Sequence, residues 1–324
     1  MQWFRVHGRD YPWRQTEDPY AILVSEVMLQ QTQIATVLDR GYYDRWMSRF
    51  PDWAALAAAS EEEVLKAWEG LGYYRRARNL QRLATVVLAD HGGEFPQSPA
   101  EMESLPGVGP YTAGAVASFA FDLPQPIVDG NVARVLSRLY DDATPIDSNE
   151  GKIQLWARAG EMVRGSGSPR LFNSAIMELG QTICRPLAPR CSECPVEAQC
   201  KASAPEKLPV KQTKTEITAI TERVVFSQNA EGILLEQEMG SRRTGMWKLP
   251  ALLGDHSHFP VIVKTTYGIT RYKVTLWVHE ADEMATGENI RRVSLAEMED
   301  LAMPSPYRKA LRAILGARHF ELKA

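Results

Sequence analysis

Residues 105–114 read Leu105-Pro106-Gly107-Val108-Gly109-Pro110-Tyr111-Thr112-Ala113-Gly114. A predicted helix ends before this string, and a second one is expected to begin at Pro110, because proline suits the first helical position. Two glycines let the backbone approach a phosphate without a Cβ in the way, and the free N–H groups at the start of the second helix point at the anion.

This pattern predicts a helix-hairpin-helix anchor that contacts the DNA backbone without reading bases. The residues expected to contact DNA there are Gly107, Val108, Gly109 and Thr112. The alternative is a tight turn between two packed helices.

The chain around the hairpin is predicted to be helical over residues 1–202. Residues 20–39 contain neither proline nor glycine and carry apolar side chains at helical spacing, which predicts one helix. Residues 60–63 and 98–101 match the capping box that begins a helix. Residues 203–218 hold prolines and lysines without periodicity and are interpreted as a linker.

A second domain is predicted over residues 219–324, and it is expected to contain both strands and helices (α+β). Strands are expected within residues 220–226, 232–235 and 272–278, the last of which alternates with period two. Two helices are expected near the C-terminus, one capped at residues 294–297 and one over residues 307–315.

The composition is that of an ordinary globular protein. Of the 324 residues, 44% are hydrophobic and 24% are charged, and the net charge is −3. No apolar run reaches the about 18 residues that a membrane span requires, and the first residues lack the pattern of a signal peptide. A cytoplasmic, nucleoid-associated protein with no membrane partner is therefore predicted.

The net charge gives no direct sign of a nucleic-acid partner. A local basic cluster, Arg75-Arg76-Ala77-Arg78, could form a DNA surface, but taken alone it favours a solvated helix face.

Four cysteines lie within seventeen residues, as Cys184, Cys191, Cys194 and Cys200. A chain of this length without a signal peptide is not expected to use them as a disulfide framework. Four clustered thiolates indicate a metal site, and tetrahedral zinc and a [4Fe–4S] cluster would each be satisfied by them.

Two carboxylates are candidates for acid–base chemistry. Glu26 shares a helix face with Ile22 and Leu23, so burial should raise its pKa and make it a proton donor near neutral pH. The alternative is a glutamate paired with an arginine at the edge of an apolar stripe. Asp129 precedes a predicted helix start, where it can act as N-cap while the helix dipole stabilises its ionised form. Such a pair is what cleavage of a glycosidic bond requires.

Several strings together resemble one family. They are Tyr11-Pro12-Trp13-Arg14, Ser25-Glu26-Val27-Met28-Leu29-Gln30-Gln31-Thr32-Gln33, Gly70-Leu71-Gly72-Tyr73-Tyr74, the hairpin string, Val128-Asp129-Gly130-Asn131-Val132 and the cysteine spacing. In this order they resemble the MutY family of adenine DNA glycosylases, within the endonuclease III, helix-hairpin-helix superfamily. The resemblance implies a mainly α glycosylase fold followed by a small α+β, Nudix-like domain.

The resemblance also implies roles at the reaction centre. Glu26 matches the acid that protonates N7 of adenine, and Asp129 matches the carboxylate that stabilises the oxocarbenium ion. Asn131 resembles a polar helper. Tyr111 occupies the position at which bifunctional relatives carry a Schiff-base lysine, which implies a monofunctional enzyme.

Further residues match family positions that contact DNA, base or cofactor. Gln31 and Tyr73 resemble the residues that wedge into the duplex when adenine is flipped out. Arg9, Trp13 and Arg14 match positions that line the adenine pocket. The four cysteines are, by the same resemblance, ligands of a [4Fe–4S] cluster.

In the C-terminal domain, Gly245-Met246-Trp247-Lys248-Leu249-Pro250 resembles a stretch of the family's Nudix-like lesion-recognition domain. The chain departs from the family at Thr270 and Arg271, which replace the Ser-His pair of the lesion-recognition loop, and at Ser174, where relatives carry Glu or Gln. The implied activity is base-excision repair by a monomer that removes adenine opposite 8-oxoguanine, and also opposite guanine, in double-stranded DNA.

Overall fold

The computed structural model describes residues 1–212, 216–240, 243–252, 254, 259–269, 271–281 and 289–321. It contains two compact units. The first comprises residues 1–54 and 82–214, and the second comprises residues 55–81 and 215–324. The predicted linker and its boundaries at 203–218 stay a prediction, whereas the grouping of residues 55–81 with the C-terminal region was not foreseen from the sequence.

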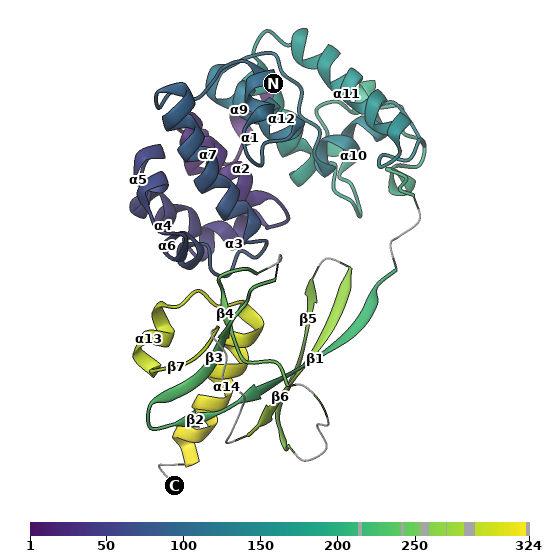
Figure 1. Cartoon of the computed structure of the whole chain (residues 1–324). Coiled ribbons are helices and arrows are strands. Elements are labelled where there is room, and N and C mark those ends of the chain that lie inside the picture. Colours follow the sequence, from purple (N-terminus) through teal and green to yellow (C-terminus); the bar gives the residue numbers. More distant parts are fainter. Residues whose placement is uncertain are drawn as a thin grey trace. The chain divides into compact units, whose positions relative to one another are not determined.

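The first unit is helical, as predicted (Figure 1). Its helices are α1 (Gln2–His7), α2 (Pro19–Leu29), α3 (Ile34–Asp39), α4 (Tyr42–Arg49), α8 (Pro99–Ser104), α9 (Pro110–Phe121), α10 (Gly130–Leu139), α11 (Asn149–Arg164) and α12 (Pro169–Thr182). Two more helices, α5 (Trp53–Ala58) and α7 (Arg75–His91), run from one unit into the other. Short 3-10 turns η1 (Pro12–Arg14), η2 (Cys191–Glu193), η3 (Glu197–Gln199) and η4 (Pro205–Lys207) complete the unit.

Helix α2 is the central helix of this unit. It begins after Asp18, whose carboxylate accepts a hydrogen bond from the backbone N–H of Tyr20 at 2.9 Å. Every residue from Tyr20 to Met28 is buried, because α3, α4 and α9 pack against the helix. Glu26 is therefore carried into the interior on a helix that has no exposed face.

The single helix expected over residues 20–39 is wrong. Helix α2 ends at Leu29, α3 begins at Ile34, and Gln31 adopts a left-handed conformation with φ of 59°. A residue in that conformation cannot continue a right-handed helix. The apolar spacing continues across the break, so periodicity alone did not reveal it.

The predicted hairpin is present between α8 and α9. Gly107 has φ of +80°, a conformation that glycine adopts without strain, and Gly109 is the N-cap of α9. The capping box expected at residues 98–101 is not formed, because the Ser98 side chain makes no cap hydrogen bond.

The second unit contains two small sheets, which confirms the predicted α+β character. In one sheet β6 (Tyr272–Glu280) lies between β1 (Thr218–Phe226), to which it is parallel, and β5 (Val261–Ile269), to which it is antiparallel. In the other, β3 (Gly232–Gln237) pairs with β2 (Gln228–Asn229), β4 (Trp247–Lys248) and β7 (Ile290–Val293).

Three helices complete this unit, namely α6 (Glu61–Ala67), α13 (Leu295–Asp300) and α14 (Ser305–Glu321). The capping boxes predicted at Ser60 and Ser294 are both formed, with a side-chain and a backbone hydrogen bond in each. The core of the unit joins the sheets to α13 and α14 through Phe226, Leu235, Met298 and Tyr307.

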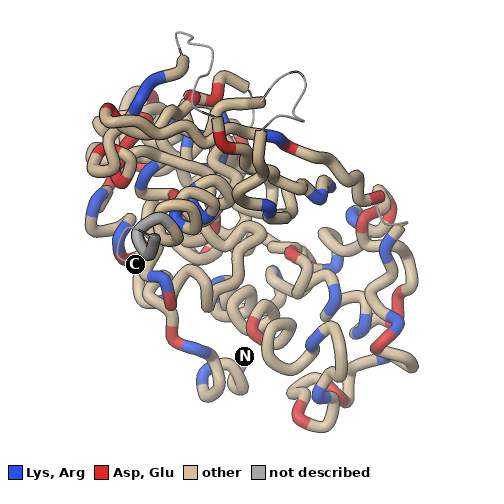
Figure 2. The backbone as a smooth tube through the Cα atoms, turned by 90° about the horizontal axis from the view of Figure 1, so that it is seen from below, with Lys and Arg blue, Asp and Glu red and all other residues tan. Residues whose placement is uncertain are grey.

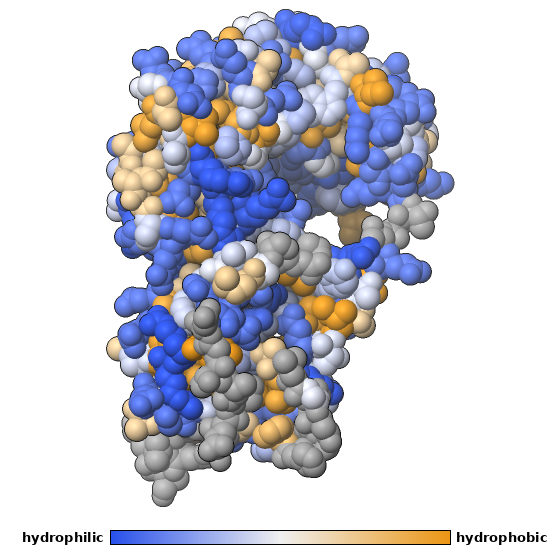
Figure 3. Space-filling model, in the orientation of Figure 1, coloured by the Kyte–Doolittle hydropathy of each residue, from blue (hydrophilic) through white to orange (hydrophobic). Residues whose placement is uncertain are grey.

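The surface carries both charge signs. Figure 2 shows basic and acidic residues interspersed along the described backbone. On the face shown in Figure 3 hydrophilic residues predominate, with scattered hydrophobic patches over the helical unit. Within the described part of the chain, no helix has the length and apolar character needed to cross a membrane.

Candidate active site

Glu26 carries a buried carboxyl group that accepts a hydrogen bond from Tyr111. Its exposed fraction is 5%, and the Tyr111 hydroxyl donates to its Oε2 at 2.9 Å. Burial raises the pKa of Glu26 to about 7, and the negative charge of Asp129 raises it further, while the Tyr111 hydrogen bond and Arg14 act in the opposite direction. A large fraction of the Glu26 carboxyl is therefore protonated near neutral pH.

Asp129 is held differently, by donors at the start of α10. Its Oδ1 accepts hydrogen bonds from the backbone N–H groups of Asn131 at 2.9 Å and Val132 at 2.7 Å. Its Oδ2 accepts from the Asn131 side-chain amide at 2.7 Å. Three donors and a helix N-terminus stabilise an ionised carboxylate. The predicted N-cap is thus confirmed, and the two carboxyl groups have contrasting surroundings.

Asn131 is fixed from its other side by a buried arginine. Its Oδ1 accepts from Arg134 Nη2 at 2.9 Å, and the same nitrogen donates to the Gly180 carbonyl at 2.7 Å. A Cβ on Gly180 would lie 2.7 Å from the Asn131 Cβ. The absence of a side chain at position 180 therefore lets α12 approach the start of α10 closely enough to hold Asn131 in place.

Two cavities of the helical unit meet at Glu26. One of about 890 Å³ is lined by Glu26, Tyr111, Asp129, Asn131 and Gln31, among others. The other, of about 530 Å³, shares Glu26 and is lined by Tyr11, Trp13, Arg14 and Ser174. The residues assigned to catalysis from the sequence therefore line one cavity together, and Trp13 and Arg14 line its neighbour.

An ion-pair cluster around a buried glutamate could not be recognised in the sequence. Glu178 in α12 is fully buried, and its Oε1 accepts from Arg9 Nε at 2.6 Å while its Oε2 lies 2.9 Å from Arg14 Nη2. Glu178 therefore holds two of the predicted pocket residues. The signal that singled out Glu26, a glutamate among apolar helical neighbours, also applies to Glu178 beside Leu179.

The two residues proposed to wedge into the duplex share an exposed position and an unusual backbone conformation. Gln31 and Tyr73 are both exposed and both adopt left-handed backbone conformations, with φ of 59° and 49°. Such conformations cost free energy in non-glycine residues and cluster at functional sites.

The hairpin presents its backbone rather than its side chains. A Cβ on Gly109 would meet nothing within 4 Å. The side chains of Val108 and Thr112 are buried, and the Val108 N–H donates to the Leu105 carbonyl at 3.2 Å, so both residues support the turn from within.

The four cysteines are free thiols in the loop after α12. No group of three or more His, Cys, Asp or Glu residues in the described ranges has the arrangement of a metal site. Burial raises the pKa of the Cys194 thiol, and the charges of the other three cysteines raise it as well. Arg138 is buried and its Nη1 lies 3.4 Å from the Cys184 Sγ. A donor set of four thiols beside a buried cation fits an anionic thiolate-ligated group.

In the C-terminal region Thr270 lies outside the described residues. Arg271 is exposed, and its Nη2 donates to the Tyr272 hydroxyl at 3.1 Å. Trp247, from the string that resembles the Nudix-like domain, is buried in β4.

Comparisons with known proteins indicate the class of protein. Residues 24–157 match the HhH-GPD superfamily of base excision DNA repair proteins. Adenine DNA glycosylase of Buchnera aphidicola (subsp. Baizongia pistaciae) is 36% identical over 255 residues, which cover 76% of this chain and 70% of that protein. The human protein of the same name is 47% identical over 211 residues, covering 62% of this chain.

Solved structures show the same fold. A thermostable thymine-DNA glycosylase is 32% identical with a TM-score of 0.56, and the match covers 62% of this chain and 91% of that one. Endonuclease III in a non-covalent DNA complex has a TM-score of 0.50 at 24% identity, covering 64% and 92% of the two chains. The fold and the site thus define a helix-hairpin-helix base excision repair protein. The chain belongs to the adenine DNA glycosylase family, although it spans only 38% of the length of the human relative.

Proposed function

We propose that this protein is a monofunctional adenine DNA glycosylase of base excision repair. It removes adenine paired with 8-oxoguanine, and with guanine, from double-stranded DNA, as a monomer associated with the nucleoid. The observation that carries the proposal is the buried Glu26, whose pKa is raised to about 7 and which shares a cavity with Asp129.

The proposed reaction uses the contrast between the two carboxyl groups. Protonated Glu26 donates its proton to N7 of adenine, so that the pair of electrons of the N-glycosidic bond leaves with a neutral base. The sugar becomes an oxocarbenium ion, whose positive charge is stabilised by ionised Asp129. Water then adds at C1′ and releases a proton, and an abasic site remains.

Tyr111 decides the fate of that abasic site in this proposal. Its phenol donates to Glu26 Oε2, which leaves Oε1 to carry the transferable proton. A phenol cannot form the Schiff base that an amine forms, so the strand stays intact until alkali cleaves it.

Access to adenine requires that the base leave the duplex. In the proposal the hairpin holds the phosphate backbone, Gln31 and Tyr73 fill the space vacated in the duplex, and Arg9, Trp13 and Arg14 surround the base. The C-terminal region, with Arg271 and Thr270, reads the lesion on the opposite strand.

A second candidate function is removal of thymine from T·G mismatches, because one solved relative is named a thymine-DNA glycosylase. Glu26 argues against it, since thymine has no N7 to protonate. The test is to incubate the protein with duplexes that contain A·8-oxoguanine, A·G, T·G or A·T and to look for strand breaks after alkali. Breaks confined to the two adenine mismatches support the proposal, and breaks confined to T·G overturn it.

The pKa of Glu26 predicts a pH dependence of adenine release. The reactive form is protonated, so the single-turnover rate should fall about tenfold per pH unit above a pKa of about 7. Tyr111→Phe removes a hydrogen bond that lowers this pKa and should move the inflection to higher pH. An inflection that stays in place, or moves to lower pH, would count against Glu26 as the acid.

The cysteine site predicts bound iron. We propose that Cys184, Cys191, Cys194 and Cys200 hold a [4Fe–4S] cluster, which ties the loop after α12 to α10. Protein purified without oxygen should be brown and contain about four iron atoms per chain, and Cys194→Ser should lower both the iron content and the melting temperature. Stoichiometric zinc without iron would contradict the assignment.

The hairpin predicts a loss of DNA affinity that does not depend on sequence. Gly107→Ala places a Cβ on a residue with φ of +80°, which strains the turn that presents the backbone N–H groups. Affinity for matched and mismatched duplexes should fall by a similar factor, because phosphate contacts carry no base information. Filter binding or fluorescence anisotropy measures this. A loss confined to the 8-oxoguanine duplex would show that the turn contacts the lesion.

A further inference from the structure

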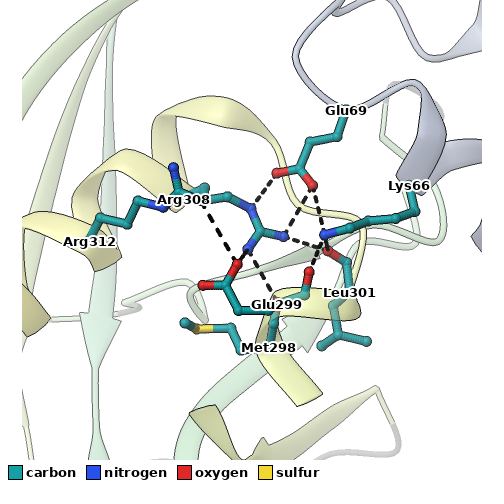
Figure 4. A network of polar contacts seen from close by, with 7 residues as sticks. All are labelled: Lys66, Glu69, Met298, Glu299, Leu301, Arg308 and Arg312. Carbon is teal, nitrogen blue, oxygen red and sulfur yellow. Dashed lines mark hydrogen bonds and ion pairs between the residues drawn. The ribbon is translucent and has the colours of Figure 1, made fainter. Parts of the chain in front are cut away.

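The second unit contains a polar cluster around the buried Arg308 that the reaction does not use (Figure 4). At its centre is Arg308 of α14, whose side chain is 9% exposed and forms a two-pronged ion pair with Glu69. The Nε of Arg308 pairs with Oε1, and its Nη2 lies 3.2 Å from Oε2. These two residues are 239 positions apart in the sequence.

Arg308 and Lys66 make further hydrogen bonds around this ion pair. Arg308 donates to the carbonyls of Met298, at 3.2 Å, and Leu301. Lys66 donates to Glu69 Oε2 at 3.2 Å and to the carbonyls of Glu299 and Leu301. Figure 4 shows Glu69 and Lys66 next to each other, both pointing toward Arg308 and the end of α13. Lys66, in the last turn of α6, and Glu69, two residues after the end of α6, attach this segment to α13 and α14.

Glu69 immediately precedes the turn at residues 70–74, which carries Tyr73. Tyr73 is 46% exposed with φ of 49°, and Gly70 and Gly72 also have positive φ. The Gly72 carbonyl accepts from Trp68 Nε1 at 2.9 Å and from Arg76 Nη2 at 3.1 Å. A tyrosine persists in such a conformation only where its surroundings hold it there.

We infer that Arg308 is a positioning residue for Tyr73. By fixing Glu69, it holds the N-terminal end of the turn and so maintains the strained backbone that presents the Tyr73 ring for insertion between base pairs. The inference rests on the proposed function, in which Tyr73 is a wedge residue. The C-terminal region thereby contributes to base flipping through the turn, besides any contact with the lesion.

An arginine suits this task better than a lysine would. The planar guanidinium meets both oxygens of one carboxylate and still reaches two carbonyls, whereas an ammonium group is a point charge. The competing interpretation is that the pair only stabilises the unit. If the pair only stabilised the unit, removing Arg308 would have the same effect on DNA unstacking whether or not Tyr73 is present. This difference can be tested.

The first test measures backbone hydrogen exchange without DNA. Arg308→Ala should accelerate exchange of the amides of residues 69–76 about tenfold, because the partly buried Glu69 carboxylate loses its two-pronged partner and keeps only Lys66, so that the turn opens locally. Arg308→Lys should give an intermediate effect and serves as the test if the alanine variant does not fold. Arg312→Ala is the matched control, since Arg312 lies on the same helix, is 67% exposed and approaches Glu299 only at 3.9 Å. Unchanged exchange at residues 69–76 in both Arg308 variants would overturn the inference.

The second test measures wedge insertion and does not require base release. A duplex carries the fluorescent base 2-aminopurine beside the mispaired adenine, and its fluorescence rises when neighbouring bases unstack on binding. In the protein that retains Tyr73, Arg308→Ala should remove most of this fluorescence rise. In a Tyr73→Ala protein, adding Arg308→Ala should leave the fluorescence unchanged. Equal losses in both backgrounds would show that Arg308 does not act through Tyr73. Neither test depends on adenine release. If the proposed activity is wrong, the mispaired adenine stays in the same duplex, and this outcome is distinguished from a failure of the inference.

Discussion

Glu26→Gln is expected to abolish adenine release while leaving the affinity for the mismatched duplex nearly intact. The substitution keeps the shape of the side chain and an oxygen that can accept from Tyr111, but it removes the transferable proton. General acid catalysis contributes about 10²–10⁴-fold, and departure of unprotonated adenine should suffer at least this loss. Single-turnover kinetics with excess protein on a duplex containing A·8-oxoguanine measure the effect.

The control for this variant is Glu150→Gln. Glu150 is an exposed glutamate in the first turn of α11 and lines neither cavity at Glu26. It should retain the wild-type rate. If Glu26→Gln also retained that rate, the buried carboxyl would be a structural group and the proton would come from elsewhere.

Asp129→Asn should reduce the rate by about 10²–10³-fold, the loss typical when one group that stabilises transition-state charge is removed. Asparagine is as good an N-cap as aspartate, so Oδ1 can still accept from the N–H groups of Asn131 and Val132 and α10 should still form. What is lost is the negative charge opposite the oxocarbenium ion, together with the acceptor for the Asn131 side chain.

Asp18→Asn is the matched control for this change. Asp18 caps α2 as Asp129 caps α10, but it lines neither cavity. The melting temperatures of the two variants should be similar, and only Asp129→Asn should slow adenine release. Equal rates for both variants would mean that the charge of Asp129 plays no part in the reaction.

The local features of the site were predictable because they depend on neighbours in sequence. A glutamate among apolar helical positions predicted the burial of Glu26, and Asp129 before Gly130 and Asn131 predicted the cap of α10. The Gly-x-Gly string likewise predicted the hairpin.

Features that depend on distant partners were not predictable. Arg9 and Glu178 are 169 residues apart, and nothing in either local pattern indicates that they pair. The pairing of Glu69 with Arg308 and the grouping of residues 55–81 with the C-terminal region have the same origin. Strand β5 was also missed, because its residues are at most half-buried and its sequence lacks the period-two alternation seen in β6.

The most direct test of the account is to identify the base that the protein releases. A duplex with one adenine opposite 8-oxoguanine is incubated with the protein, and the free bases are quantified by chromatography and mass spectrometry while the strand is examined without alkali. We expect one free adenine for each duplex converted and an unbroken strand. Release of another base, or no base release at all by correctly folded protein, would contradict it.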